Sequence, residues 1–339
     1  MKTKVNKKKI NKKKETKKTK KKTSKNKLKE KKHPKPEKTG PVGFVVGDDP
    51  SWGRLGNQLF VVSTILAYAW DHNFTPVFPY FNRPYFAKET DQLTYNRDRI
   101  FFRLNTSDFP HKIHKQYSYA PLAYKPIPRC KNNTNLSLQG QFVSWKYLHH
   151  HYDKLVALFE PCSAVLDHVR SKYAKLIENP NTVAIHVRTY SKDLHEGGLP
   201  FVGINFFKLA LAESPNGATF VIFSDRINWC KVNFQKLFPD KSFVFIEGND
   251  PIEDLHLMSL MKHQIISNST YSWWGAYLNK NPNKIVICPQ QLLRKASSWP
   301  IQDCYLPDWR VIQHNFTVEP YPEDIADYDE KTSDDTKKY

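Results

Sequence analysis

The pattern of apolar and polar positions is clearest in the second half of the chain. Short runs rich in Val, Ile and Phe alternate there with segments that place apolar residues at helical spacing. The predicted strands are residues 182–187, 219–223, 243–246, 264–267 and 284–288, and the predicted helices are residues 205–212, 227–237, 251–263 and 268–279. Strands that alternate with single helices form right-handed crossovers. This half is therefore predicted to be a doubly wound, mainly parallel α/β domain.

The first half contains one unit of the same kind. Residues 43–47 are predicted to form a buried strand, residues 48–58 a loop and residues 59–70 an apolar helix. Residues 74–150 are rich in Pro, Tyr, Phe, Asn and His and show weak periodicity, so the pattern predicts no topology for them. We expect a related but more irregular Rossmann-like domain here.

Charge is distributed very unevenly along the chain. The formal net charge is +19, of which residues 1–40 carry +17, residues 318–339 carry −5 and residues 41–317 the remaining +7. This balance argues against a basic nucleic-acid-binding domain. A Lys-rich segment of low complexity buries too little apolar surface to offset its ordering entropy, so a disordered tail is predicted at the N-terminus. The expected organisation is a tail (1–40), two domains (41–180 and 181–312) and an acidic tail (313–339).

Composition excludes several other classes of protein. No run reaches the roughly 18 apolar residues of a transmembrane helix, and no apolar segment follows the charged N-terminus as in a secretory signal. We therefore expect a soluble, cytoplasmic protein without a membrane anchor. Five widely spaced cysteines without a C-x-x-C pair predict buried thiols, not a zinc site or a disulfide framework. Consecutive histidines at 149–151 point in different directions, so a shared metal site is not expected there.

Chemically active side chains follow the predicted strands. In a doubly wound sheet, ligands bind beyond the carboxyl ends of the strands at the switch point. His186 and Arg188 end the strand at 182–187, Asp225 follows the next strand, and residues 267–270 (SNST) precede a helix. A guanidinium and a helix N-terminus favour an anion, and Asp225 with His186 can contact a base edge such as that of guanine. Taken singly, each group also fits a structural role as a cap or an ion-pair partner.

A glycine-containing loop follows the predicted strand at 43–47. Its sequence, GRLGNQ at residues 53–58, matches neither the G-x-G-x-x-G fingerprint nor a Walker loop. Two glycines between a strand and a helix still permit close backbone approach to a phosphate or a sugar.

Together these segments resemble glycosyltransferase family 11, the α-1,2-fucosyltransferases. The resemblance covers about residues 42–312 and rests on the following motifs: GRLGNQLF (53–60), HVR (186–188), FSDRINWC (223–230), DLHLMS (254–259), ISNSTYSWWGAYL (266–278), KIVI (284–287) and PDW (307–309). It implies a GT-B-like fold of two Rossmann-type domains facing a cleft, with residues 41–180 on the acceptor side and residues 181–312 binding the donor.

The resemblance also implies the reaction. It is the inverting, metal-independent transfer of L-fucose from GDP-β-L-fucose to the 2-hydroxyl of a galactose-like acceptor sugar, which gives an α-1,2 linkage. No cofactor and no metal are expected, because preorganised cations and N–H donors can stabilise the leaving diphosphate. The D-x-D sequence at 327–329 is interpreted as solvated charge in the acidic tail. The partners are GDP-fucose and a glycan acceptor with a terminal galactose-like sugar.

Roles carry over from the family to matching positions. Arg188 resembles the arginine that neutralises the diphosphate, and His186 and Asp225 occupy the positions that contact guanine in related enzymes. Further donor-binding residues are implied beside the β-phosphate and the donor sugar: Gly53, Gly56, Asn57, Asn268, Ser269 and Thr270.

The loop after Arg188 departs from the family pattern. The family usually has a second arginine there, followed by Gly-Asp, whereas this chain has TYSKD at 189–193, where Lys192 can act as a point charge. Arg226 also stands where the family often has an acid. Glu196 is the first candidate for the catalytic base and Asp193 the second. A strongly dissociative transition state works without a well-placed base.

Two alternative functions remain open. One is a catalytically inactive module that binds a GDP-sugar or a glycan, with the Lys-rich tail binding polyanions without specificity. The other is a transferase for a different nucleotide sugar. Trp273 and Trp274 can form a sugar-stacking platform, although helical positions within a β–α unit favour a core role.

Overall fold

The structure, a computed structural model, describes residues 40–47, 53–82, 93–119, 123–189, 200–290 and 300–313. The predictions made for the Lys-rich tail before Gly40, for the D-x-D sequence and for the acidic tail beyond residue 313 lie outside these residues. So do the two candidate bases, Asp193 and Glu196, and Lys192 beside them.

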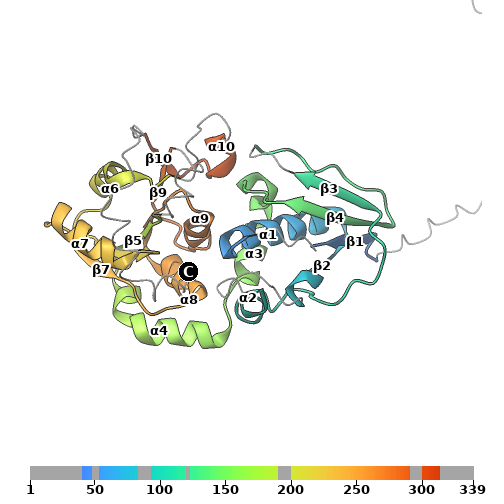
Figure 1. The fold of residues 1–339 in the computed structure, drawn as a ribbon, viewed down its shortest axis with the longest axis horizontal. Helices are drawn as coiled ribbons and strands as arrows, with labels where there is room; N and C mark the ends of the chain where they lie inside the picture. Colours follow the sequence, from blue (N-terminus) through green and yellow to red (C-terminus); the bar gives the residue numbers. More distant parts are fainter. Residues whose placement is uncertain are drawn as a thin grey trace, which may run out of the picture. The chain divides into compact units, whose positions relative to one another are not determined.

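The second half of the chain forms a six-stranded parallel sheet in the order β10-β9-β8-β5-β6-β7 (Figure 1). Its strands are β5 (Thr182–Val187), β6 (Thr219–Ser224), β7 (Ser242–Phe245), β8 (His263–Ile265), β9 (Val286–Pro289) and β10 (Arg310–Ile312). Read from β7, this is the 3-2-1-4-5-6 order of the Rossmann fold. The predicted doubly wound sheet is thus confirmed. Its strand order reverses between β5 and β8.

Helices cover both faces of this sheet. They are α4 (Ser163–Glu178), α6 (Gly203–Ala212), α7 (Ile227–Leu237), α8 (Pro251–Leu260), α9 (Thr270–Tyr277) and α10 (Ile301–Cys304). Alternate residues of β5 point to opposite faces. Val183 and Ile185 join the core under α6 and α7, whereas Ala184 joins the core that includes α8 and α9. His186 is two residues after Ala184 and therefore points toward α9.

The first half forms a four-stranded parallel sheet in the order β2-β1-β4-β3. Its strands are β1 (Gly43–Val46), β2 (Thr75–Val77), β3 (Lys115–Tyr119) and β4 (Thr134–Gly140). The accompanying helices are α1 (Leu55–His72), α2 (Leu93–Arg99) and α3 (Tyr152–Leu158), with 3₁₀ turns η2 (Pro79–Asn82), η3 (Trp145–Tyr147) and η4 (His149–His151). Two parallel α/β sheets therefore confirm the predicted fold class.

Helices α1 and α9 pack side by side between the two sheets (Figure 1). The ring of Phe60 on α1 lies 4.5 Å from the ring of Trp273 and 5.3 Å from that of Trp274, measured between centroids. Both indoles are buried, with exposed fractions of 3% and 0%. Their predicted core role is confirmed, and the packing fixes how the first turns of the two helices approach each other.

Other predictions about cysteines and membranes can be compared with the described residues. All five cysteines lie within them as free thiols, and four are buried while Cys162 is half-buried. No helix in the described segments is both long enough and apolar enough to cross a bilayer.

The prediction that consecutive histidines point in different directions is wrong for one pair. Nε2 of His150 lies 2.9 Å from Oδ2 of Asp71, and Nε2 of His151 lies 2.8 Å from Oδ1 of the same carboxylate. Side chains one residue apart in a 3₁₀ turn diverge by about 120°. The two imidazoles nevertheless converge on Asp71, because each ring contacts a different oxygen of its carboxylate.

Candidate functional site

The N-terminal ends of α1 and α9 meet at the predicted site. A Cβ at Gly56 would lie 2.5 Å from the backbone N of Tyr271 and 2.7 Å from Oγ1 of Thr270, so glycine alone permits this approach. The Thr270 hydroxyl donates a hydrogen bond of 2.7 Å to Oδ1 of Asn57. In the described structure neither helix carries an acidic residue in its first turn. Two partially positive helix ends therefore face one place, an arrangement that favours a bound anion.

Side-chain hydrogen bonds shape the start of each helix. Ser269 is the N-cap of α9, and its hydroxyl accepts a hydrogen bond of 3.3 Å from the backbone N–H of Tyr271. Before α1, Gly53 has a φ of +73°, in the left-handed region that favours glycine. The Gln58 side chain donates to the carbonyl of Gly53 at 2.9 Å and accepts from the buried Asn96 at 2.9 Å. The turn into α1 is thereby held in one conformation.

Arg188 and Asp225 form an ion pair across the ends of β5 and β6. Nη1 of Arg188 lies 3.1 Å from Oδ2 of Asp225, and both side chains are largely buried. The other oxygen, Oδ1, accepts hydrogen bonds from the backbone N–H and the hydroxyl of Thr189, at 3.1 and 3.3 Å. Asp225 therefore orients the guanidinium and the start of the following loop. The planar fork of a guanidinium suits the oxygens of a phosphate as well as those of a carboxylate.

His186 is buried beside the first turn of α9. Its Nδ1 lies 2.8 Å from Oγ of Ser267, and its ring centroid lies 5.5 Å from that of Tyr271. Ser267 in turn lies 3.4 Å from the hydroxyl of Ser272, measured between oxygens. Burial lowers the pKa of His186 to about 3, against a smaller opposing effect of Asp225. The imidazole is therefore neutral near pH 7 and adds no charge to the site.

The structure brings most predicted site residues to one edge of the six-stranded sheet. They lie at or just after the carboxyl ends of β5, β6 and β8, on both sides of the switch point, or at the start of α1 beside α9. Asn268 is buried, and its side-chain amide donates to the carbonyl of Pro200 at 2.8 Å. Both oxygens of Asp225 already accept hydrogen bonds or an ion pair, so a guanine contact would share this carboxylate with Arg188 and Thr189. The role of each residue in binding stays a prediction.

Comparison with known families agrees with this arrangement. The sequence profile described as Glycosyl transferase family 11 matches residues 49–313, well over half of the chain. This chain belongs to glycosyl transferase family 11. The predicted resemblance is confirmed over the segments that carried it.

Relatives of this chain differ in the sugar that their names give. An alpha-1,2-colitosyltransferase of Escherichia coli is 34% identical over 157 residues, which cover 44% of this chain and 53% of that protein. Human galactoside alpha-(1,2)-fucosyltransferase 1 is 26% identical over 260 residues, covering 67% of this chain and 63% of that enzyme. The chain thus spans between half and two thirds of these relatives' lengths. The solved NodZ alpha-1,6-fucosyltransferase, co-crystallised with GDP, is 13% identical with a TM-score of 0.49, and the match covers 72% of this chain and 94% of NodZ.

The buried His186 of this family 11 chain predicts a specific pH dependence of stability. The unfolded imidazole has a pKa near 6.5 and the folded one a pKa of about 3. Between these values the unfolded state binds a proton that the folded state does not, so stability is complete above pH 6.5 and falls as the pH decreases. One such proton contributes a slope of up to about 1.4 kcal/mol per pH unit. His186→Asn is expected to flatten the profile of unfolding free energy by up to this slope.

Urea unfolding at several pH values between about 7 and 5 measures this slope in both proteins. Burial also lowers the pKa of His256, to about 4, but this group is present in both proteins and cancels in the comparison. Parallel profiles for the wild type and His186→Asn would contradict the prediction.

The sequence analysis did not predict a cluster of ion pairs and hydrogen bonds that joins α2 to α8. The Arg99 guanidinium lies 2.7 Å from Oδ2 of Asp250 and 3.0 Å from Oε1 of Glu253. The Tyr95 hydroxyl donates to the same Asp250 oxygen at 2.7 Å, while Asp250 caps α8 in a capping box with Glu253. Acidic residues in the first turn of α8 were visible in the sequence, but their basic partner lies over 150 positions earlier. These contacts join α2, which ends at Arg99, to α8, which packs against α9.

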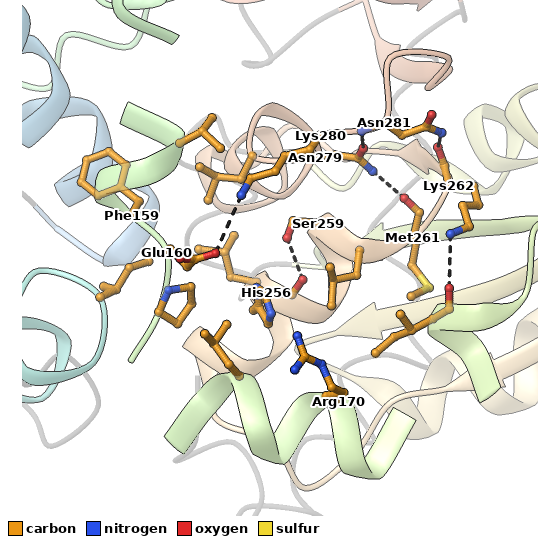
Figure 2. A pocket seen from close by; sticks show the side chains of 18 residues that line it. Phe159, Glu160, Arg170, His256, Ser259, Met261, Lys262, Asn279, Lys280 and Asn281 are labelled. Atoms are coloured by element: carbon orange, nitrogen blue, oxygen red, sulfur yellow. Dashed lines mark hydrogen bonds and ion pairs between the residues drawn. The ribbon is translucent and has the colours of Figure 1, made fainter. Parts of the chain in front are cut away.

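A pocket of about 440 Å³ lies away from the residues predicted to bind the donor (Figure 2). It is lined mainly by residues of α4 and α8 and of the segments that follow α3, α8 and α9, and its polar side chains include Glu160, Arg170, His256 and Lys280. Glu160 and Lys280 form an ion pair of 3.8 Å across it. No residue predicted to bind the donor lines this pocket, so it is distinct from the candidate site.

Proposed function

We propose that this chain is an inverting fucosyltransferase. It would transfer L-fucose from GDP-β-L-fucose to the 2-hydroxyl of a galactose-like acceptor sugar and form an α-1,2 linkage. The observation that carries the proposal is the meeting of the α1 and α9 N-termini beside the Arg188–Asp225 pair. Membership of family 11 and the names of its fucosyltransferase relatives support it.

The diphosphate is the part of the donor that this arrangement suits best. Cleavage of the bond between the anomeric carbon and the phosphate oxygen leaves an additional negative charge on GDP. In the proposed mechanism the guanidinium of Arg188 binds the diphosphate, while the Ser269 hydroxyl and the N–H groups of Ser269 and Thr270 bind the β-phosphate. Preorganised donors of this kind stabilise charge as it develops and need no reorganisation during the reaction. They supply the function that a divalent ion has in other transferases, so we propose a metal-independent reaction.

Inversion requires the acceptor to attack from the face opposite the leaving group. The acceptor oxygen forms a bond to the anomeric carbon, the bond to GDP breaks, and the β-linked sugar becomes α-linked. The hydroxyl proton passes to a base, for which Glu196 and then Asp193 are the proposed residues. Asn57, with Gly53 and Gly56 allowing close approach, is proposed to face the donor sugar.

The base of the donor is proposed to lie near His186 and Asp225. A neutral imidazole beside the Ser267 hydroxyl can accept or donate a hydrogen bond without adding positive charge. Asp225 can accept from adjacent N–H donors of guanine in addition to its contacts with Arg188 and Thr189.

A second candidate donor is a nucleotide-activated colitose. It is favoured by the relative named as an alpha-1,2-colitosyltransferase, which is 34% identical to this chain over the matched segment. The same diphosphate site would serve both donors, since they differ in the sugar.

Release of GDP tests the proposal. The full chain is incubated with GDP-fucose, EDTA and a panel of acceptors that end in β-galactose, with nucleotide-activated colitose as the competing donor. We expect GDP release that depends on the acceptor, and a product whose linkage analysis gives α-1,2-fucose. GDP binding without release for any donor would instead indicate a binding module, and activity that EDTA abolishes and manganese restores would refute the metal-independent mechanism.

A further inference from the structure

Two imidazoles and a carboxylate converge at the C-terminal end of α1. The Nε2 atoms of His150 and His151 lie 2.9 and 2.8 Å from the two oxygens of Asp71. The candidate ligand atoms of these three side chains all lie within 4.8 Å of one another. Asp71 is fifteen positions after Gly56 on the same helix, about 22 Å along its axis. The cluster is therefore separate from the candidate donor site.

Packing holds the two rings in place. The ring of His151 packs edge-on against that of Trp70, with centroids 5.0 Å apart, and lies 4.4 Å from the ring of His150. The side chain of His151 is 15% exposed, whereas those of Asp71 and His150 are 37% and 48% exposed. One imidazole is thus anchored, and solvent reaches the other two groups.

The position of Asp71 favours a bound cation. Asp71 lies in the last turn of an 18-residue helix, where the partial negative charge of the helix end disfavours a carboxylate. A positive ion at this carboxylate offsets both the side-chain charge and the helix end.

We propose that Asp71, His150 and His151 bind a divalent transition-metal ion, for which zinc is the best match. Imidazole and carboxylate are ordinary zinc ligands at about 2.0 to 2.2 Å, and three protein ligands leave one tetrahedral position for water. Donor atoms in such a site are about 3.3 Å apart. The N···O separations of 2.8 and 2.9 Å are near this value, and all the candidate ligand atoms lie within 4.8 Å of one another. The ion links the end of α1 to η4, so its expected effect is on stability.

Zinc titration of the full chain without a histidine tag tests this proposal. The protein is stripped of metal, and Zn²⁺ is added in competition with a chromogenic chelator. We expect one site whose affinity falls at least about tenfold in His150→Gln and in Asp71→Asn. His150→Gln changes a half-exposed side chain and is the primary variant. His111→Gln, which removes an exposed histidine elsewhere in the first half, is the matched control and should keep the site.

Thermal unfolding provides a second readout. Zinc is expected to raise the Tm of the wild type and of His111→Gln, because it binds the folded state, and to have less effect on the other two variants. No zinc binding by the wild type would overturn the proposal. Equal zinc affinity in the wild type, His150→Gln and Asp71→Asn would overturn it as well.

Discussion

Replacing Arg188 with alanine is expected to lower kcat/KM for GDP-fucose by about 100- to 1,000-fold, the usual effect of removing a preorganised donor to a developing negative charge. Arg188 is held by Asp225 at 3.1 Å beside the switch point of the sheet, so its guanidinium is oriented before the donor binds. Steady-state GDP release measures the effect. A loss confined to KM would mean that Arg188 binds donor and transition state equally.

Two control variants test whether the loss of activity is specific to the guanidinium of Arg188. Arg188→Lys retains the charge but not the planar fork, and we expect it to recover only a small part of the activity. Arg310→Ala removes an exposed arginine on β10 that pairs with Glu213 at 3.0 Å, and it should leave turnover unchanged. Full activity of Arg188→Ala would rule out the proposed mechanism.

Gly56→Ala is expected to destabilise the protein and to abolish donor binding. Alanine is the better helix former by about 1 kcal/mol, so a gain in stability would follow if space allowed. Here the new methyl group meets the backbone of Thr270 and Tyr271 at 2.5 to 2.7 Å, and backbone cannot move aside as a side chain can. Overpacking of this kind costs about 1 to 3 kcal/mol or more. Separation of α1 from α9 also breaks the Asn57–Thr270 hydrogen bond.

Gly275→Ala is the matched control for this variant. Gly275 is also a helical glycine at an interhelical contact, but a Cβ there meets the flexible side chain of Met258. We therefore expect a smaller loss of stability and retained GDP binding. Urea unfolding and GDP titration of both variants measure the difference, and equal behaviour would contradict the argument from backbone contact.

Sequence patterns predicted the second half of the chain well because strands such as β5, β6 and β9 are buried on both faces and the strands alternate with helices. Residues 182–187 match β5 at both ends, and the other predicted strands differ from the observed ones by at most two positions. The chemistry at the strand ends was also predictable, since a doubly wound sheet brings His186, Arg188 and Asp225 to one edge.

Elements in the first half were harder to predict for physical reasons. In β4, Leu136, Ser137 and Leu138 are all buried, so the strand lacks the alternation that marks a half-buried strand. Strand β3 lies at the edge of its sheet and is mostly exposed. Helix α1 begins at Leu55, four positions before the predicted start at residue 59, because Gly56 belongs to a helix although glycine usually interrupts one.

Contacts between residues far apart in sequence were not predictable. Asp71 meets His150 and His151 across about 80 positions, and Arg99 meets Asp250 across a longer interval. Spacing along the chain carries no signal for such pairs, since they depend on how the two sheets and their helices pack.

A crystal structure of the full chain with GDP shows directly whether Arg188 and the start of α9 bind the diphosphate. We expect the diphosphate within hydrogen-bonding distance of the Arg188 guanidinium and of the Ser269 and Thr270 groups at the start of α9, and beside the first turn of α1. Binding of GDP elsewhere, for example in the pocket between α4 and α8, or with its phosphates remote from Arg188, would contradict it.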